Sequence, residues 1–106
     1  MKIMVPIDVF DIAAYFFFGD EELKRFYKET GIKEIEPTAR GFTANNATWV
    51  KDDNDMNTII HEAYHLTHFL LDCIHTKDEE TGAYLIEYIV QHVVNKIRKR
   101  KKQGLS

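Results

Sequence analysis

Runs of apolar residues, separated by polar or glycine-containing breaks, divide the chain into a series of short elements. Residues 2–8 and 12–18 are rich in β-branched and aromatic side chains, which favours two strands. The second run contains two alanines and leaves a helix open, but its aromatic end, Phe16-Phe17-Phe18, favours a strand that stops at Gly19. Proline lacks a backbone N–H, so Pro6 places the first strand at a sheet edge or in a bulge.

The middle of the chain predicts a short helix followed by a hairpin. Residues 20–22 are acidic and precede apolar residues at helical spacing, and Thr30-Gly31 ends that helix. A connector, residues 32–40, leads to strand-like segments at 41–44 and 48–51. Between them lies Asn45-Asn46, and asparagine tolerates the positive φ that a tight hairpin turn needs.

Two longer helices complete the pattern. The first begins after Asn54 or Asp55 as N-cap and runs to about Ile74, and it is apolar enough to be largely buried. The second opens at residues 78–80 and continues to about Lys99. The order predicts an α+β fold: a single small domain in which a short, mostly antiparallel sheet packs on one face against three helices.

Composition agrees with a folded domain of 12.4 kDa, with 44% hydrophobic and 12% aromatic residues. The single cysteine, Cys73, excludes a disulfide framework and a cysteine-based zinc site, and its apolar neighbours predict a buried thiol. No run of apolar residues approaches a membrane span, and Asp8 and Asp11 interrupt the N-terminal segment too early for a signal peptide. We therefore expect a cytoplasmic protein without membrane contact.

Charge is distributed unevenly along the chain. Six basic residues within 96–102 contribute +6 to a net charge of −3, so the rest of the chain carries −9. A basic C-terminal tail, about residues 96–106, could neutralise phosphates. The acidic body would repel the same phosphates, however, and basic residues also complement the C-terminus of a helix. Nucleic acid is therefore the least favoured partner.

The stretch with the most specific chemistry is H-E-x-x-H at residues 61–65. Residues i and i+4 lie on one face of a helix, so His61 and His65 can bind one metal ion, and zinc is the default for imidazole ligands. Glu62 follows the first histidine and can act as general base toward a metal-activated water. The alternative is an amphipathic helix whose histidines meet ordinary hydrogen-bond partners.

Catalytic zinc sites usually take a third protein ligand. The acidic start of the second helix could supply one if the two helices pack antiparallel, and the small Ala83 would let them approach closely. Glu80 is the first choice, and Glu79 is the runner-up because periodicity does not settle an offset of one residue. The alternative is an acidic first turn that only complements the helix dipole.

His68 shares the face of the histidine pair but lies about 10 Å along the axis from His61, too far to bind the same ion. We expect it to pack or to support the ligands. The metzincin pattern requires a glycine three residues after the second histidine and a third histidine three residues further on, and His68 and Leu71 occupy those positions, which excludes that class.

Residues 57–90, with the H-E-x-x-H motif and the E-E-x-x-A-Y run at 79–84, resemble the small zincin-like metallopeptidases of the gluzincin type, in particular compact, uncharacterised ones of phages and bacteria. The resemblance covers a third of the chain. It implies zinc held by His61, His65 and Glu80, with Glu62 as base. The larger gluzincins carry a substrate-binding subdomain after the zinc site, and this chain departs from them in having no comparable segment.

Two functions follow from these residues. The first is zinc-dependent hydrolysis of an amide bond in a peptide or protein, in which Glu62 transfers the proton of the water to the leaving amine and Tyr84 or Tyr64 stabilises the oxyanion. The second is a non-catalytic, metal-stabilised module that binds a partner protein. Phe42 or Trp49 could form the wall of a substrate cleft, although core packing explains both more simply. The wide apolar stripe of the last helix is compatible with a homodimer.

Overall fold

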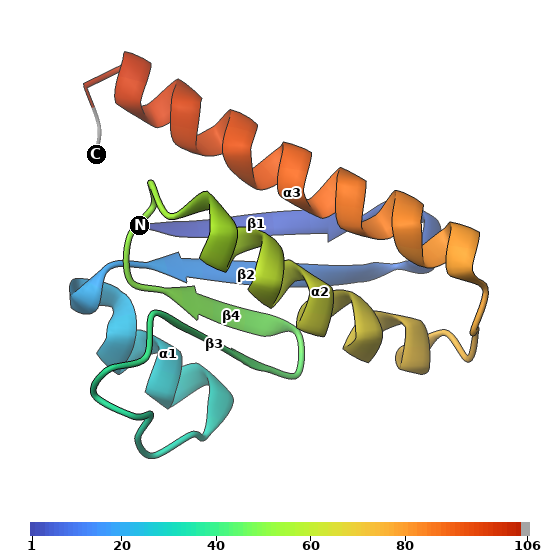
Figure 1. The fold of residues 1–106 in the computed structure, drawn as a ribbon, viewed down its shortest axis with the longest axis horizontal. Coiled ribbons are helices and arrows are strands. Elements are labelled where there is room, and N and C mark those ends of the chain that lie inside the picture. The colour runs from blue at the N-terminus through green and yellow to red at the C-terminus, as the bar shows by residue number, and fades with distance from the viewer. Residues whose placement is uncertain (105–106) are drawn as a thin grey trace.

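A computed structural model describes residues 1–104 of the chain (Figure 1). Within these residues, the α+β class predicted from the sequence is confirmed: four strands form one mixed sheet and three α-helices pack against it. The elements, in chain order, are β1 (Lys2–Ile7), the 3₁₀ turn η1 (Asp8–Phe10), β2 (Ile12–Phe18), the 3₁₀ turn η2 (Asp20–Glu22), α1 (Leu23–Thr30), β3 (Gly41–Ala44), β4 (Ala47–Val50), α2 (Met56–Cys73) and α3 (Glu79–Lys102).

The strand order in the sheet is β1-β2-β4-β3. β1 pairs antiparallel with β2, and β3 pairs antiparallel with β4 in the hairpin that the sequence predicts at Asn45-Asn46. The central β2–β4 pair is parallel, because the chain crosses over through α1 between them. The two outer strands are β1, which carries Pro6 at a sheet edge as expected, and β3, which contacts α2.

The sheet is covered on both faces. Alternation along β2 sends Phe16 and Phe18 into the core under α2 and α3, and Phe17 into a second core under α1. The expectation that all helices share one sheet face is therefore wrong. The parallel step from β2 to β4 needs a crossover helix, and Phe17, Ala47 and Trp49 provide the apolar surface that buries it.

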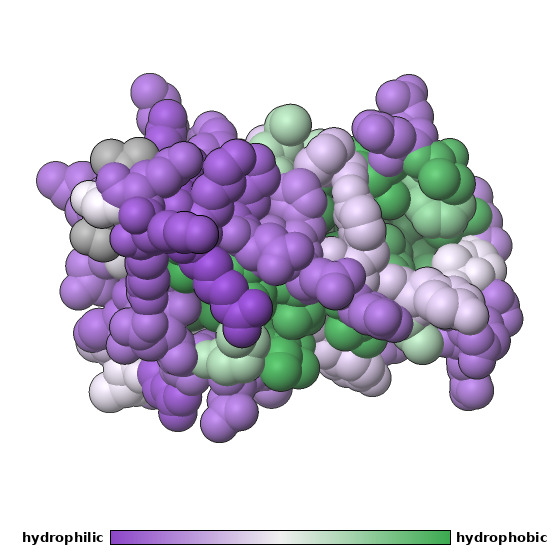
Figure 2. All heavy atoms as spheres, turned by 90° about the horizontal axis from the view of Figure 1, so that it is seen from above, coloured by the Kyte–Doolittle hydropathy of each residue, from purple (hydrophilic) through white to green (hydrophobic). Residues whose placement is uncertain are grey.

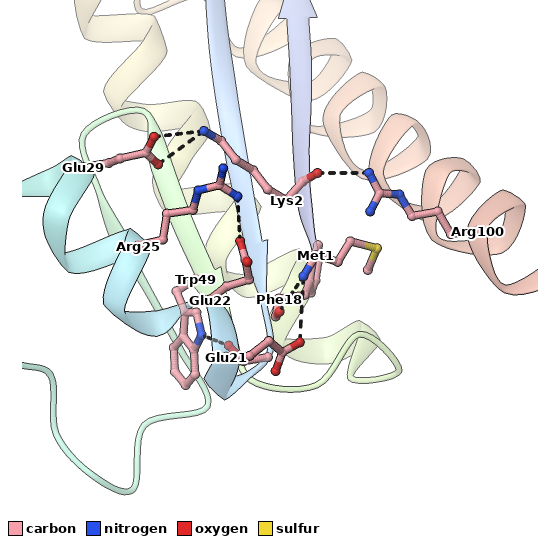
Figure 3. Close-up of polar contacts among 10 residues, drawn as sticks. Met1, Lys2, Phe18, Glu21, Glu22, Arg25, Glu29, Trp49 and Arg100 are labelled. Carbon is pink, nitrogen blue, oxygen red and sulfur yellow. Dashed lines mark hydrogen bonds and ion pairs between the residues drawn. The ribbon is translucent and has the colours of Figure 1, made fainter. Parts of the chain in front are cut away.

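The outer strand β1 is tied to helices on both sides (Figure 3). The Lys2 ammonium lies 3.0 Å from a carboxylate oxygen of Glu29 on α1, and the Lys2 carbonyl accepts a hydrogen bond of 3.3 Å from Arg100 on α3. The indole N–H of Trp49 donates to the Gly19 carbonyl at 2.7 Å. Trp49 is thus a core residue with a satisfied polar group, which agrees with the simpler reading of this side chain.

α2 and α3 lie antiparallel and side by side over the sheet (Figure 1). Each begins at an aspartate N-cap, Asp55 and Asp78, whose side chain accepts from the backbone N–H three residues later. α3 continues to Lys102, so most of the basic segment is helix rather than tail. The prediction of a buried Cys73 thiol is wrong, because the last buried residue of α2 is Leu70 and Cys73 is exposed at the end of the helix.

Candidate metal and catalytic site

Hydrogen bonds and an ion pair at Asp55 connect the start of α2 to the start of β3. The Asp55 carboxylate accepts from the Thr58 hydroxyl at 2.6 Å and from the Thr58 backbone N–H at 3.2 Å. It also receives the Arg40 guanidinium at 2.6 and 2.9 Å. The Thr58 hydroxyl and the Arg40 cation hold the pKa of Asp55 below its ordinary value. Because Arg40 directly precedes β3, this cluster fixes the strand and the helix relative to each other.

Gly41 lets the backbone of β3 run directly against α2. A Cβ atom at this position would lie 2.7 Å from the Thr58 methyl carbon and 2.9 Å from Cγ of Glu62. Both distances are well inside van der Waals contact, so only glycine allows this approach. The strand therefore forms one wall around the Glu62 side chain.

His61 and His65 lie together on the exposed face of α2. Their Nε2 atoms are 3.2 Å apart. Two nitrogens bound tetrahedrally to one zinc ion, each at about 2.0–2.1 Å, lie roughly 3.3 Å from each other. The separation of the two nitrogens therefore matches that of two zinc ligands, and it also permits a hydrogen bond between the two imidazoles.

Glu62 is buried between α2 and β3, with 7% of its surface exposed. Its Oε2 atom lies 3.9 Å from Nε2 of His61, and its Oε1 atom accepts a hydrogen bond of 2.9 Å from the Thr43 hydroxyl. One carboxylate oxygen is therefore held by the sheet, and the other faces the histidine pair. An open cleft of about 360 Å³ adjoins Glu62 and one histidine of the pair; it is lined by Gly41, Phe42, Thr43, Asn45, Glu62, His65 and Phe69.

The acidic start of α3 lies along a different groove. Glu79 and Glu80 are both exposed; Glu79 lines this groove together with Tyr64 and His68 of α2, and Glu80 lies outside the lining. Among residues 1–104, no three His, Cys, Asp or Glu side chains are arranged to hold a metal ion. The glutamate ligand stays a prediction from the sequence.

The close approach of α2 and α3 is made by Gly82, which is buried with its missing Cβ 3.2 Å from a methyl carbon of Leu71. Ala83, which the sequence suggested for this role, is exposed. His68 contacts the ring of Tyr64, with centroids 4.4 Å apart, and stays outside the cleft of Glu62 and His65.

Tyr84 lies away from the histidine pair. It is 68% exposed and lines a groove between α3 and the end of β1, with Ile7, Phe10 and Leu85 among its neighbours. In Figure 2, which looks onto the molecule from above Figure 1, apolar residues gather at the end where α3 begins, and hydrophilic ones cover the other end. Tyr64 is the tyrosine beside the pair, with its ring 5.9 Å from that of His65. The structure thus does not bring Tyr84 to the site.

Of the two aromatic residues considered for a cleft wall, only Phe42 lines the cleft. Phe42 is paired across the strands with the buried Trp49, so its side chain projects to the α1 face, while Gly41 and Thr43 face α2. Sequence reasoning missed Gly41 and Thr43. Strand alternation places them on one face, but it does not reveal that this face meets Glu62.

The basic segment is partly used within the fold. Lys101 pairs with Asp53 at 3.1 Å, and Arg100 donates to the Lys2 carbonyl. These contacts anchor the last turns of α3 to the loop before α2 and to β1. They account for two of the six cations without any external partner.

No helix in residues 1–104 has the length and hydrophobicity needed to span a bilayer. Comparison of the chain with known proteins gave no match to any family model, curated protein or solved structure.

Proposed function

We propose that this chain is a small zincin-like metallopeptidase that hydrolyses an amide bond in a peptide or protein. The observation that supports it most is the arrangement at α2: two histidine nitrogens at the spacing of zinc ligands, beside a buried carboxylate, at an open cleft. An isolated histidine pair would carry much less weight. The adjacent carboxylate could act as a general base beside a bound metal, and the strand edge could bind a peptide substrate.

Each residue has a separate role. His61 and His65 would hold the metal through Nε2, with a glutamate from the first turn of α3 as third ligand. Glu80 is the residue that the resemblance suggests, Glu79 is the runner-up, and neither lines the cleft of Glu62 and His65. Zinc, when bound, would polarise a water molecule and the scissile carbonyl. Glu62 accepts the proton of the attacking water at Oε2 and delivers it to the leaving amine.

The outer strand β3 suggests how a peptide would bind. Ala44 and Ala47 close a two-residue turn, so in this antiparallel ladder the main-chain groups of Thr43 and Gly41 point away from β4. No strand of the sheet lies on that side. An extended peptide pairing there would run along the cleft that contains Glu62 and His65, which is the common mode of β-strand addition. This supports a peptide over a compact small molecule as substrate.

The test compares wild type with Glu62→Gln on a mixture of unstructured peptides, with zinc added and then removed by a chelator. The proposal predicts cleavage by the wild type, lost on chelation, and a fall of about 10²–10⁴-fold in rate for Glu62→Gln with zinc still bound. Glu34→Gln, which changes an exposed glutamate in the connector, should cleave at the wild-type rate. Equal rates for Glu62→Gln and wild type would contradict the role of Glu62.

The alternative is a metal-stabilised binding module. A protein of this kind would bind zinc and would be more stable with zinc than without it, but would cleave no peptide. For location we infer the cytoplasm, supported by the unpaired, exposed Cys73 thiol, which suits a reducing compartment.

A further inference from the structure

A chain of hydroxyl groups connects the sheet to the Glu62 carboxylate. The Thr43 hydroxyl oxygen lies 2.9 Å from the Thr48 hydroxyl oxygen and 2.9 Å from Oε1 of Glu62. Thr48, on the inner strand β4, is fully buried, and Glu62 is nearly so. Three polar side chains from three elements thus satisfy one another where β3, β4 and α2 meet.

The direction of these hydrogen bonds follows from the charge on Glu62. An ionised carboxylate only accepts, so Thr43 must donate its single hydroxyl proton to Oε1. The Thr43 oxygen then accepts from Thr48. The Glu62 backbone carbonyl is a second possible acceptor for that proton, but its distance from the Thr43 hydroxyl, 3.3 Å, is longer than the 2.9 Å to Oε1. Thr43 therefore binds Oε1, and Oε2 has no hydrogen-bond partner on the sheet.

The backbone of Gly41 restricts the same side chain from another direction. It leaves no room for a Cβ against Cγ of Glu62, so the strand packs on the aliphatic part of the glutamate while Thr43 holds its end. A glutamate has three side-chain torsions, and burial alone does not choose the orientation of its carboxylate. Here the strand supplies both a steric wall and a directed hydrogen bond.

We propose that Thr43 is a positioning residue: it fixes Glu62 with Oε1 toward the sheet and Oε2 toward the histidine pair, and Thr48 orients the Thr43 hydroxyl. The catalytic consequence rests on the proposed hydrolase function. A small displacement of a catalytic group can cost up to about 10²-fold in rate. Thr43→Val should therefore lower kcat by about 10-fold or more with KM little changed, and Thr43→Ser, which keeps the hydroxyl, should restore kcat. Zinc affinity should stay at the wild-type value, because no hydrogen bond joins Thr43 to either histidine.

The matched control is Thr30→Val, which removes a threonine hydroxyl that donates to the Phe26 carbonyl at 2.7 Å on α1, on the far sheet face. It should leave kcat and KM unchanged. An unchanged kcat in Thr43→Val, or failure of Thr43→Ser to restore it, would overturn the proposal.

A second measurement does not depend on turnover. Thr43→Val, Glu62→Met and the double variant form a cycle in the free energy of unfolding, measured on metal-free protein. Thr43→Val leaves the buried Glu62 carboxylate without its hydrogen bond, and this loss is absent once residue 62 is methionine, so the double variant should lose less stability than the sum of the two. Additive losses would refute the positioning contact. If the two stability losses are coupled but the wild-type protein cleaves no peptide, the Thr43–Glu62 contact is supported and the proposed hydrolase function is contradicted.

Discussion

Replacing Gly41 by alanine tests the close approach of β3 to α2. The added Cβ would lie 2.7 Å from the Thr58 methyl carbon, 2.9 Å from Cγ of Glu62 and 3.2 Å from the Trp49 carbonyl oxygen. Overpacking of this kind costs about 1–3 kcal/mol, and contact on three sides, one of them backbone, places it near the upper end. Alanine also lowers the conformational entropy of the unfolded chain, which stabilises the folded state by up to about 1 kcal/mol. A net loss of about 2 kcal/mol corresponds to a Tm roughly 8–16 °C lower for a domain near this size.

Gly82→Ala is the matched control, because its Cβ would meet only one atom, a Leu71 methyl carbon at 3.2 Å at the end of a flexible side chain. Within a helix, alanine is favoured over glycine by about 1 kcal/mol, which offsets the smaller contact. Thermal unfolding followed by circular dichroism should therefore give a lowered Tm for Gly41→Ala and a Tm at or above wild type for Gly82→Ala. Equal Tm values for Gly41→Ala and wild type would refute the strand–helix contact on which the site depends.

Two further predictions concern the surroundings of the site. The Thr58 hydroxyl and Arg40 lower the pKa of Asp55 from its ordinary value of 3.8, so its contribution to stability is complete above that value and is lost as the pH falls through the lower, folded-state pKa. The Tm difference between wild type and Asp55→Ala should accordingly be largest above about pH 5 and shrink below pH 4, and a difference independent of pH would contradict this. Trp49→Phe should destabilise the fold by about 1–3 kcal/mol, because the Gly19 carbonyl loses its partner, yet leave zinc binding unchanged. Loss of zinc binding in Trp49→Phe would place this residue in the site after all.

Local signals in the sequence predicted the elements well. Gly31 adopts the left-handed conformation that ends α1, Asn45 has φ 56° in the hairpin turn, and Asp55 is the N-cap of α2. Each of these features depends on the conformational preference of one residue and its near neighbours, which a sequence displays directly. The histidine pair was predictable for the same reason, since i and i+4 meet on any helix.

The features that the sequence did not predict depend on contacts between segments that are distant along the chain. The second apolar surface, formed by Phe17 and Trp49 under α1, follows from the parallel β2–β4 pairing, and no local pattern records that pairing. Thr43 and Glu62 are 19 residues apart, and their hydrogen bond exists only because Gly41 brings the strand against the helix. The rotational position of α3 is a third case: Glu79 and Tyr84 line two different grooves, neither of which contains the histidine pair, and no local pattern predicts which groove each residue lines.

The measurement that tests the account most directly is the zinc content of protein purified without an affinity tag, after exposure to zinc and removal of the excess. Wild type and His68→Ala, whose substitution lies outside the cleft, should each retain about one zinc ion per chain. His61→Ala and His65→Ala should each lose it, because a single imidazole with one carboxylate is a weak site. Absence of zinc from the wild type, or equal zinc content in all four proteins, would contradict the assignment of the histidine pair as metal ligands.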